Sequence, residues 1–230
     1  MSKNILATWE VTTKTNITSV IVPDGCQDLI MYLPAGDRPH WFVSPLFDET
    51  HTVTLNSNST IMGLRIRPGT RIDEANLLAS MPEDQIEYND IGERLDAFTT
   101  CKNSTKEALN NLADAKTVKQ AANEIGTTPR TLQRLVMRET GRPPVYWIML
   151  ARARKAARAL NSALCLAGIA ERYGYADQAH MCREFKRWFN ASPSVLRNTP
   201  SKLNRLADEG YDGAETGVHS SIKNPFMSET

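Results

Sequence analysis

Residues 118–134 read VKQAANEIGTTPRTLQR, and residues 166–186 read LAGIAERYGYADQAHMCREFK. Each stretch is a short helical pattern that ends at a glycine (Gly126 or Gly174), followed by a turn and a second helical pattern that opens at a capping residue. This layout predicts two helix-turn-helix motifs, and the second helix of such a motif can enter a DNA major groove. Two motifs in tandem, joined by a long basic helix, favour a protein that reads DNA sequence.

In the first motif, the second helix is expected to present polar side chains outward. Thr128 is a good N-cap residue, and Pro129 suits the first helical position because no backbone N–H is needed there. With the leucines facing the core, the residues predicted to reach DNA are Arg130, Thr131, Gln133 and Arg134. Arginine pairs with guanine or phosphate and glutamine with adenine. For Arg134 we expect phosphate contact or support of the domain rather than base reading.

In the second motif, Asp177 is the expected cap of the second helix. The exposed first turns of that helix are predicted to carry Gln178, Ala179, His180 and Arg183. His180 is explained equally well as an ordinary surface histidine. Lys186 and Arg187, near the end of the helix, are predicted phosphate contacts.

A basic helix is predicted between the motifs, with Arg152, Arg154, Lys155 and Arg158 along it. Its basic face is interpreted either as a row of phosphate contacts or as a solvated side. A rigid connecting helix would fix the distance between two readers in successive major grooves, which lie about 34 Å apart.

The overall charge of +1 hides a marked asymmetry along the chain. Residues 1–110 hold 9 Lys and Arg against 15 Asp and Glu, a net charge of −6, whereas residues 111–200 hold 15 against 6, a net charge of +9. Because the basic segment coincides with the motifs, it predicts a polyanion-binding domain attached to a region that does not bind polyanions.

Cysteine usage and hydropathy bound the class of protein. The four cysteines, Cys26, Cys101, Cys165 and Cys182, are widely spaced and form no C-x-x-C pair. We therefore expect no structural metal, no cofactor and a reducing compartment. No apolar run approaches the about 18–20 residues of a membrane span, so no membrane partner is expected. These features predict a cytoplasmic protein, associated with the nucleoid through DNA.

The N-terminal part is predicted to be β-rich. Residues 18–22, 28–33, 51–55 and 61–67 are apolar or alternating runs separated by turn residues, which favours a small antiparallel sheet or partial barrel. The predicted fold class is α+β, with a β-rich domain over residues 1–100, a linker over 101–111, an all-α domain over 112–198, and a disordered tail over 199–230. Ser104 or Thr105 is the expected cap of the helix that follows the linker.

Residues 112–198 resemble the DNA-binding domain of AraC/XylS-type bacterial transcription regulators. The matching positions are Ala121-Ala122, Thr128, Leu132-x-Arg134, Gly141-x-Pro143, Arg152-x3-Ala156-x3-Leu160, Ile169-Ala170-x3-Gly174-Tyr175, Phe185-Lys186, Ser192-Pro193 and Arg197. The chain departs from the family at Val136-Met137, where Phe-Lys is usual.

The resemblance implies a domain of seven helices in two subdomains. It places base contacts on Thr128, Arg130 and Gln133 in the first motif, and on Gln178, Ala179, His180 and Arg183 in the second. It also implies promoter or operator DNA and RNA polymerase as partners, and no catalytic activity.

The N-terminal half is similar, more weakly, to a small domain of some regulators of this family, through Pro23-Asp24-Gly25-Cys26-x-Asp28-Leu29-Ile30 and Gly63-x-Arg65-x-Arg67-Pro68-Gly69. By analogy this half would bind an unknown small-molecule effector or form a homodimer. Its candidate joining surface is the helical stretch with Ile91, Leu95, Phe98, Leu109 and Leu112, although burial within one chain explains that stretch almost as well.

Two alternatives to a sequence-specific regulator remain open. Some methyl-transfer DNA repair proteins carry the same reader on a cysteine-bearing zinc domain, but they need clustered cysteines, whereas Cys26 stands alone. The other alternative is an architectural protein that binds DNA without sequence preference.

Overall fold

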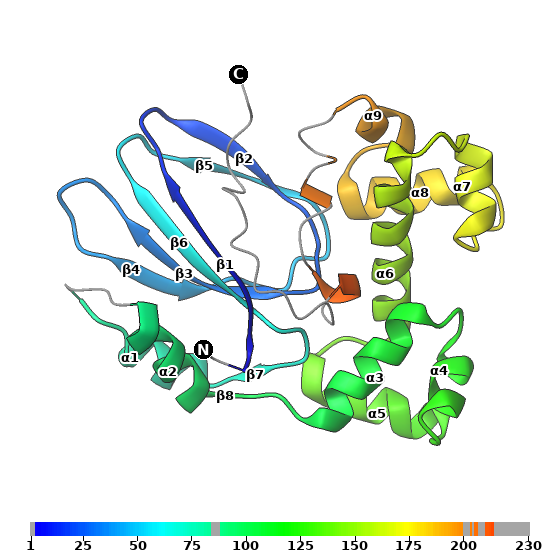
Figure 1. Ribbon diagram of the computed structural model, residues 1–230, viewed down its shortest axis with the longest axis horizontal. Coiled ribbons are helices and arrows are strands. Elements are labelled where there is room, and N and C mark those ends of the chain that lie inside the picture. Colours follow the sequence, from blue (N-terminus) through cyan, green and yellow to red (C-terminus); the bar gives the residue numbers. More distant parts are fainter. Residues whose placement is uncertain (1–2, 84–87, 200–202, 204, 207–209, 214–230) are drawn as a thin grey trace.

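The computed structural model describes residues 3–83, 88–199, 203, 205–206 and 210–213. An N-terminal β-sheet region is followed by a helical C-terminal region (Figure 1), which confirms the predicted α+β class. Among the described residues, no helix is both long enough and apolar enough to cross a membrane.

The sheet region contains one four-stranded antiparallel sheet in the order β1-β6-β3-β4, a separate pair β2-β5, and a short pair β7-β8. The strands are β1 (Ile5–Thr12), β2 (Ile17–Ile21), β3 (Gln27–Leu33), β4 (His40–Val43), β5 (His51–Leu55), β6 (Thr60–Ile66), β7 (Arg71–Ile72) and β8 (Thr99–Thr100). The four predicted strands correspond to β2, β3, β5 and β6. Strands β1 and β4 were not singled out by the sequence patterns.

The central strand β6 is buried along most of its length, as expected for a strand with partners on both sides. Gly63 lies directly beneath the indole of Trp9, where a Cβ at position 63 would be 2.1 Å from Cε2 of the ring. Only glycine leaves room for the Trp9 ring at this position.

Two helices, α1 (Glu74–Ala79) and α2 (Tyr88–Ala97), pack on the sheet. Ile91 and Leu95 of α2 are fully buried in the same cluster as Leu29 and Leu64 of the sheet. Leu109 and Leu112, predicted on the same joining surface, are buried in the helical core. The proposed dimer surface was therefore wrong for these four residues: their apolar periodicity reflects packing within one chain.

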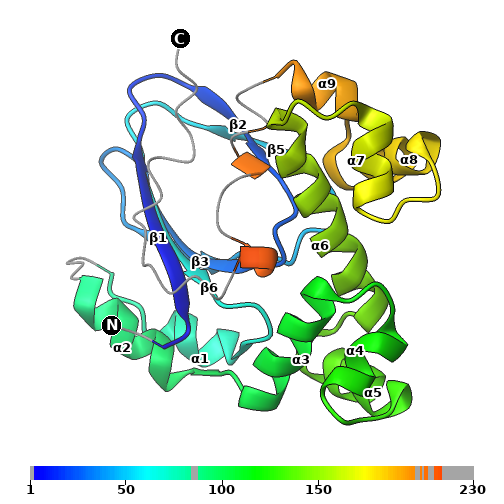
Figure 2. The same cartoon turned by 45° about the vertical axis from the view of Figure 1, so that its right-hand side comes forward.

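The helical region is arranged around α6 (Pro144–Arg158), with one group of helices at each end (Figure 2). One group is α3 (Asn103–Asp114), α4 (Val118–Glu124) and α5 (Pro129–Thr140), and the other is α7 (Leu166–Arg172), α8 (Gln178–Phe189) and α9 (Pro193–Arg197). A single apolar core, including Trp147 of α6 and Trp188 of α8, joins the groups.

Helix α3 occupies most of the segment predicted as a linker, because it begins at Asn103 and packs on α6. Its N-cap residue is Lys102, without a side-chain capping bond, and Thr105 is fully buried inside the helix. The expected cap at Ser104 or Thr105 was therefore wrong. The polar run over residues 101–105 suggested a linker, but α3 is apolar on only one face, so its first turn can be polar in sequence and still be helical.

Part of the segment predicted to be a disordered tail packs on both regions. Leu203, Leu206 and Tyr211 are buried in the helical core, and Tyr211 lies in the short 3-10 helix η2 (Tyr211–Gly213). The Tyr211 amide donates a 2.7 Å hydrogen bond to the Asp24 carbonyl, and its hydroxyl donates one of 2.7 Å to the Leu109 carbonyl. The low apolar content of this segment concealed these contacts, because a few buried side chains, namely Leu203, Leu206 and Tyr211, pack it on the core. Residues 214–230 lie outside the described residues.

Candidate nucleic-acid interface

The first motif has the local structure that its sequence predicts. Thr128 Oγ1 accepts a 3.2 Å hydrogen bond from the Thr131 amide, and Pro129 is the first residue of α5. Gly126, between α4 and α5, has a φ of 65°, which glycine adopts without strain. These features fix the angle at which α5 leaves the turn.

Helix α5 buries one face and exposes the other. Leu132 and Val136 are buried against the helical core. The five predicted DNA contacts of this motif are all exposed: Thr128, Arg130, Thr131, Gln133 and Arg134. Arg130 and Gln133 also line a shallow groove with Pro143, Pro144 and Val145 at the start of α6. The structure thus brings the candidate base readers together on one open face.

In the second motif, the Asp177 carboxylate accepts a 2.6 Å hydrogen bond from the His180 amide and so caps α8. Met181, Phe185 and Trp188 are buried. Five predicted contacts are exposed, namely Gln178, Ala179, Arg183, Lys186 and Arg187. His180 differs from them, because its side chain is only 32% exposed and is turned toward Glu184.

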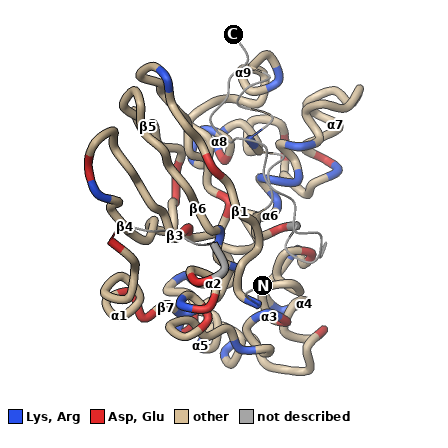
Figure 3. The backbone as a smooth tube through the Cα atoms, turned by 60° about the vertical axis from the view of Figure 1, so that its left-hand side comes forward, with Lys and Arg blue, Asp and Glu red and all other residues tan. Residues whose placement is uncertain are grey.

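The basic residues of α6 form ion pairs with other elements, and for the buried Arg154 both interpretations of this face were wrong. Arg154 is fully buried and donates to Asp212 at 2.7 Å, and Arg158 also pairs with Asp212. Arg152 donates to Glu184 at 2.9 Å, and Lys155 donates to Asp114 at 2.5 Å. Figure 3 shows these positively charged positions along α6, beside those of α8. The partners were not predictable because each lies on another element.

A loop of the sheet region reaches the helical region close to the predicted phosphate contacts. Thr50 Oγ1 donates to the Trp188 carbonyl at 3.0 Å, and the Asp48 carboxylate accepts two hydrogen bonds from Arg142. Asp48 and Glu49 also line a groove with Arg187. The sequence patterns gave no sign of this loop, because its contacts lie more than ninety residues away.

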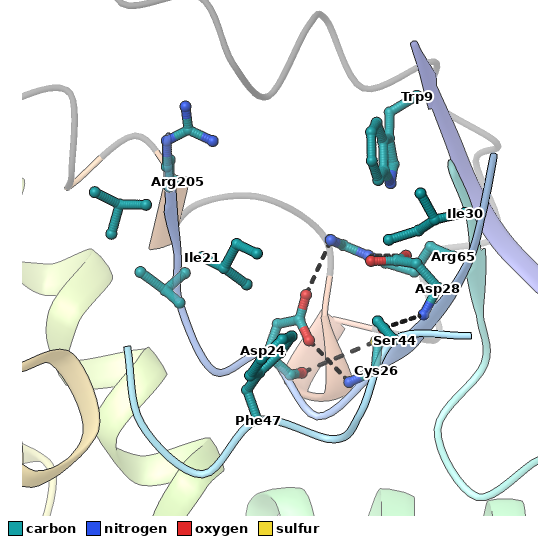
Figure 4. Close-up of a pocket in the computed structure, with 12 residues that line it drawn as sticks. Trp9, Ile21, Asp24, Cys26, Asp28, Ile30, Ser44, Phe47, Arg65 and Arg205 are labelled. Carbon is teal, nitrogen blue, oxygen red and sulfur yellow. Dashed lines mark hydrogen bonds and ion pairs between the residues drawn. The ribbon is translucent and has the colours of Figure 1, made fainter. Parts of the chain in front are cut away.

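A small cavity of about 80 Å³ lies between the sheet region and Arg205 of the C-terminal segment, with apolar walls that include Trp9, Ile30 and Phe47 (Figure 4). At one side of it, Arg65 donates to Asp24 at 3.0 Å and to Asp28 at 3.2 Å. Burial, together with the neighbouring Asp28 carboxylate, raises the pKa of Asp24 despite Arg65. The cavity has a mixed apolar and polar lining, as small-molecule sites do, but its volume is well below the about 300–1,000 Å³ of such sites.

Cys26 is buried at the edge of the same cavity. Burial, and to a lesser extent the Asp24 carboxylate, raise the pKa of its thiol well above the ordinary value. A thiol of this kind stays protonated and is a poor nucleophile. Within the described part of the chain, no three His, Cys, Asp or Glu residues are grouped so that they could hold a metal ion.

Residues 121–199 match a family model described as a helix-turn-helix domain, which spans both motifs and the connecting helix. The chain carries an AraC-type helix-turn-helix domain. Domains of this type are the DNA-binding part of transcription regulators. The AraC-type domain here comprises α5 to α9 and most of α4, and so includes every residue predicted to contact DNA.

Several solved structures are similar to this chain. The C-terminal domain of AraT, a response regulator from Geobacillus stearothermophilus, is 28% identical, with 42% of this chain and 79% of that chain covered and a TM-score of 0.35. The DNA-binding domain of AdpA, solved with a target DNA, is 27% identical, with 40% and 83% covered and a TM-score of 0.35. ToxT from Vibrio cholerae is 8% identical, with 83% and 96% covered and a TM-score of 0.45. None of the curated proteins compared matches the chain.

Proposed function

We propose that this protein is a sequence-specific regulator of transcription that reads two successive major grooves of double-stranded DNA with α5 and α8. The observation that carries this proposal is that α5 and α8 lie at opposite ends of α6 and both expose polar and basic side chains. Two readers on one face of B-DNA should be about 34 Å apart, and a rigid connecting helix suits that requirement.

Within this proposal, base edges are read by Arg130 and Gln133 in one groove and by Gln178, Ala179 and Arg183 in the other. Thr128 and Thr131, at the start of α5, contact the nearest backbone or base. Arg134, Lys186 and Arg187 bind phosphate, because exposed cations that contact the backbone carry affinity rather than sequence information. His180 is assigned a separate role below.

The sheet region, residues 1–100, is the proposed control domain, and α3 belongs with the reader because it packs on α6. A small-molecule effector is one form of control, and the cavity beside Asp24 and Arg65 is its candidate site. A homodimer would raise the effective concentration of a second reader at paired sites. RNA polymerase is the further partner that a transcription regulator in the cytoplasm would contact.

A methyl-transfer repair function is disfavoured by the buried, protonated thiol of Cys26. Binding without sequence preference is the more serious alternative, since a basic surface alone gives micromolar or weaker affinity for any duplex.

Selection of bound duplexes from a random pool by the full-length chain tests the proposal. We expect an enriched sequence with two elements about 10 base pairs apart, and affinity that falls steeply as salt rises. Binding without any enriched sequence at physiological salt would support the architectural alternative instead. Absent or salt-insensitive binding would remove DNA from the function altogether.

A further inference from the structure

The imidazole of His180 is turned back onto the protein, although His180 lies in the exposed first turn of α8. Its Nδ1 accepts a 3.3 Å hydrogen bond from the Ala176 amide, in the turn that precedes the helix. Its Nε2 lies 3.8 Å from Oε1 of Glu184, one turn further along α8. Both ring nitrogens therefore face groups of the same chain, and Nδ1 is used in a hydrogen bond within it.

The groups around His180 form a cluster that joins α6 to the turn and the second helix of the second motif. The His180 ring packs edge-on against Tyr175, with centroids 5.5 Å apart. The Arg152 guanidinium of α6 lies over the Tyr175 ring, 4.6 Å from its centroid, and donates to Glu184 at 2.9 Å. Glu184 is 8% exposed and Tyr175 is buried, so the cluster is anchored in the interior.

We propose that His180 is a positioning residue of the second motif: it fixes the first turn of α8 against the preceding turn, while Gln178, Ala179 and Arg183 face the DNA. This inference rests on the proposed function, because it assigns a role within DNA reading. This positioning role takes the place of the base contact predicted for His180 from the sequence.

Two hydrogen bonds show which segment of the second motif His180 holds in place. The Ala176 amide precedes the cap of α8 and has the imidazole Nδ1 as its acceptor, so the turn and the helix are joined twice, by Asp177 and by His180. Gln178 and Ala179 lie between these two joints, and their side chains extend from the fixed segment. A small rotation of that segment would move both away from base edges that must be met within tenths of an ångström.

The tautomer of His180 provides a test that needs neither DNA nor a variant. A neutral imidazole that accepts at Nδ1 carries its hydrogen on Nε2. Long-range proton–nitrogen NMR correlations of the full chain at pH 7.5 should therefore show His180 protonated at Nε2 only. Hydrogen on Nδ1 would overturn the assignment, because the bond from Ala176 could not then form.

Two substitutions separate positioning from base reading on the duplex enriched by selection. In His180→Asn, the side-chain oxygen replaces Nδ1 as acceptor at nearly the same place, whereas His180→Ala removes the acceptor. We expect His180→Ala to weaken binding to the enriched duplex about three- to tenfold and to relax the preference at the base positions read by Gln178 and Ala179, because both side chains extend from the segment that His180 fixes. We expect His180→Asn to stay within about twofold of the wild type.

Gln178→Ala is the matched control, since it should lose preference at one base position. If His180→Ala leaves intact the base position that Gln178→Ala relaxes, or if His180→Asn is as weak as His180→Ala, His180 is not a positioning residue. Unfolding midpoints of the variants identify any loss of fold. Failure of the wild-type chain to prefer any duplex refutes the proposed function, whereas these outcomes refute only the role of His180.

Discussion

The Arg142 guanidinium and the Asp48 carboxylate form a two-bonded ion pair across the two regions of the chain. Nε donates to one carboxylate oxygen at 3.1 Å and Nη2 donates to the other at 2.8 Å. Asp48 belongs to the acidic sheet region, while Arg142 lies between α5 and α6 beside the groove of Arg130 and Gln133. The pair therefore neutralises a cation of the reader close to its candidate DNA-binding face.

Replacing Asp48 by Asn should make Arg142 available to a DNA phosphate. The logarithm of affinity against the logarithm of salt concentration should become steeper by about one unit, with tighter binding at low salt. Because both side chains are partly exposed, stability should change by less than about 1 kcal/mol. Salt titrations of the full chain on one duplex measure the slope.

Glu49→Gln is the control for that experiment, since it removes the same charge from the neighbouring residue. A slope that rises equally in both variants would indicate a general charge effect. An unchanged slope in Asp48→Asn would show that Arg142 does not reach DNA.

Base reading and phosphate binding should separate by mutation. Arg130→Ala, Gln133→Ala and Gln178→Ala should each cost about 1–3 kcal/mol on the enriched duplex and relax the preference at one base position. Lys186→Ala should weaken enriched and random duplexes alike and lower the salt slope by about one unit. A changed base preference in Lys186→Ala would contradict the proposed placement of α8.

The buried pair of Arg154 and Asp212 should matter for stability rather than for DNA affinity. Both side chains are fully buried, so Asp212→Asn removes the carboxylate bonded to the buried Arg154 charge and should destabilise the chain by about 3–5 kcal/mol at pH 7. Asp114→Asn, which breaks the exposed pair with Lys155, should cost less than about 1 kcal/mol. Urea unfolding of the full chain compares the two.

The cost of Asp212→Asn should also depend on pH. Burial opposes ionisation of Asp212, but Arg154 and Arg158 outweigh it and lower its pKa. A carboxylate with a lowered folded pKa stabilises the fold above its unfolded pKa of about 3.9, and this contribution is lost as the pH falls through the folded value. The difference between wild type and variant should therefore be constant near neutrality and shrink only below about pH 4. A difference that is the same at pH 7 and pH 3 would contradict this.

Local signals in the sequence were sufficient for the two motifs. Thr128, Pro129 and Asp177 cap or open their helices as predicted, because capping depends on residues three positions apart. The exposed faces of α5 and α8 follow from the helical period in the same way. The residues that determine where each helix begins and which face it exposes lie close together in the sequence, and both features were therefore predictable.

Long-range ion pairs were not predictable from the sequence. Arg152 and Arg154 fit the pattern of a solvated basic face, yet their partners Glu184 and Asp212 lie 32 and 58 residues away. His180 had the period of an exposed residue, but its neighbours turn it inward. Tertiary contacts decide which Lys and Arg side chains remain available to DNA. Helical periodicity in the sequence carries no information about these contacts.

The turn at Gly25 should show how closely the C-terminal segment is fitted to the sheet region. Gly25 has a φ of 79°, and a Cβ there would lie 2.7 Å from Cβ of Tyr211. Gly36 has nearly the same φ, 75°, but a Cβ there would meet nothing within 4 Å. Gly36→Ala should therefore cost only the backbone strain of about 1–2 kcal/mol, whereas Gly25→Ala should cost clearly more, because Tyr211 must also move. Urea midpoints of the two variants give the comparison.

A double substitution isolates the contact between Gly25 and Tyr211. Tyr211→Gly alone loses the packing of the ring on Trp147 and the hydrogen bond to the Leu109 carbonyl. In the Gly25→Ala background the same change also removes the clashing Cβ, so it should cost less than in the wild type. Since the two residues are in contact, the difference should exceed the about 0.5 kcal/mol expected for independent sites. Equal costs in both backgrounds would mean that residue 211 does not pack against the Pro23–Cys26 turn in solution.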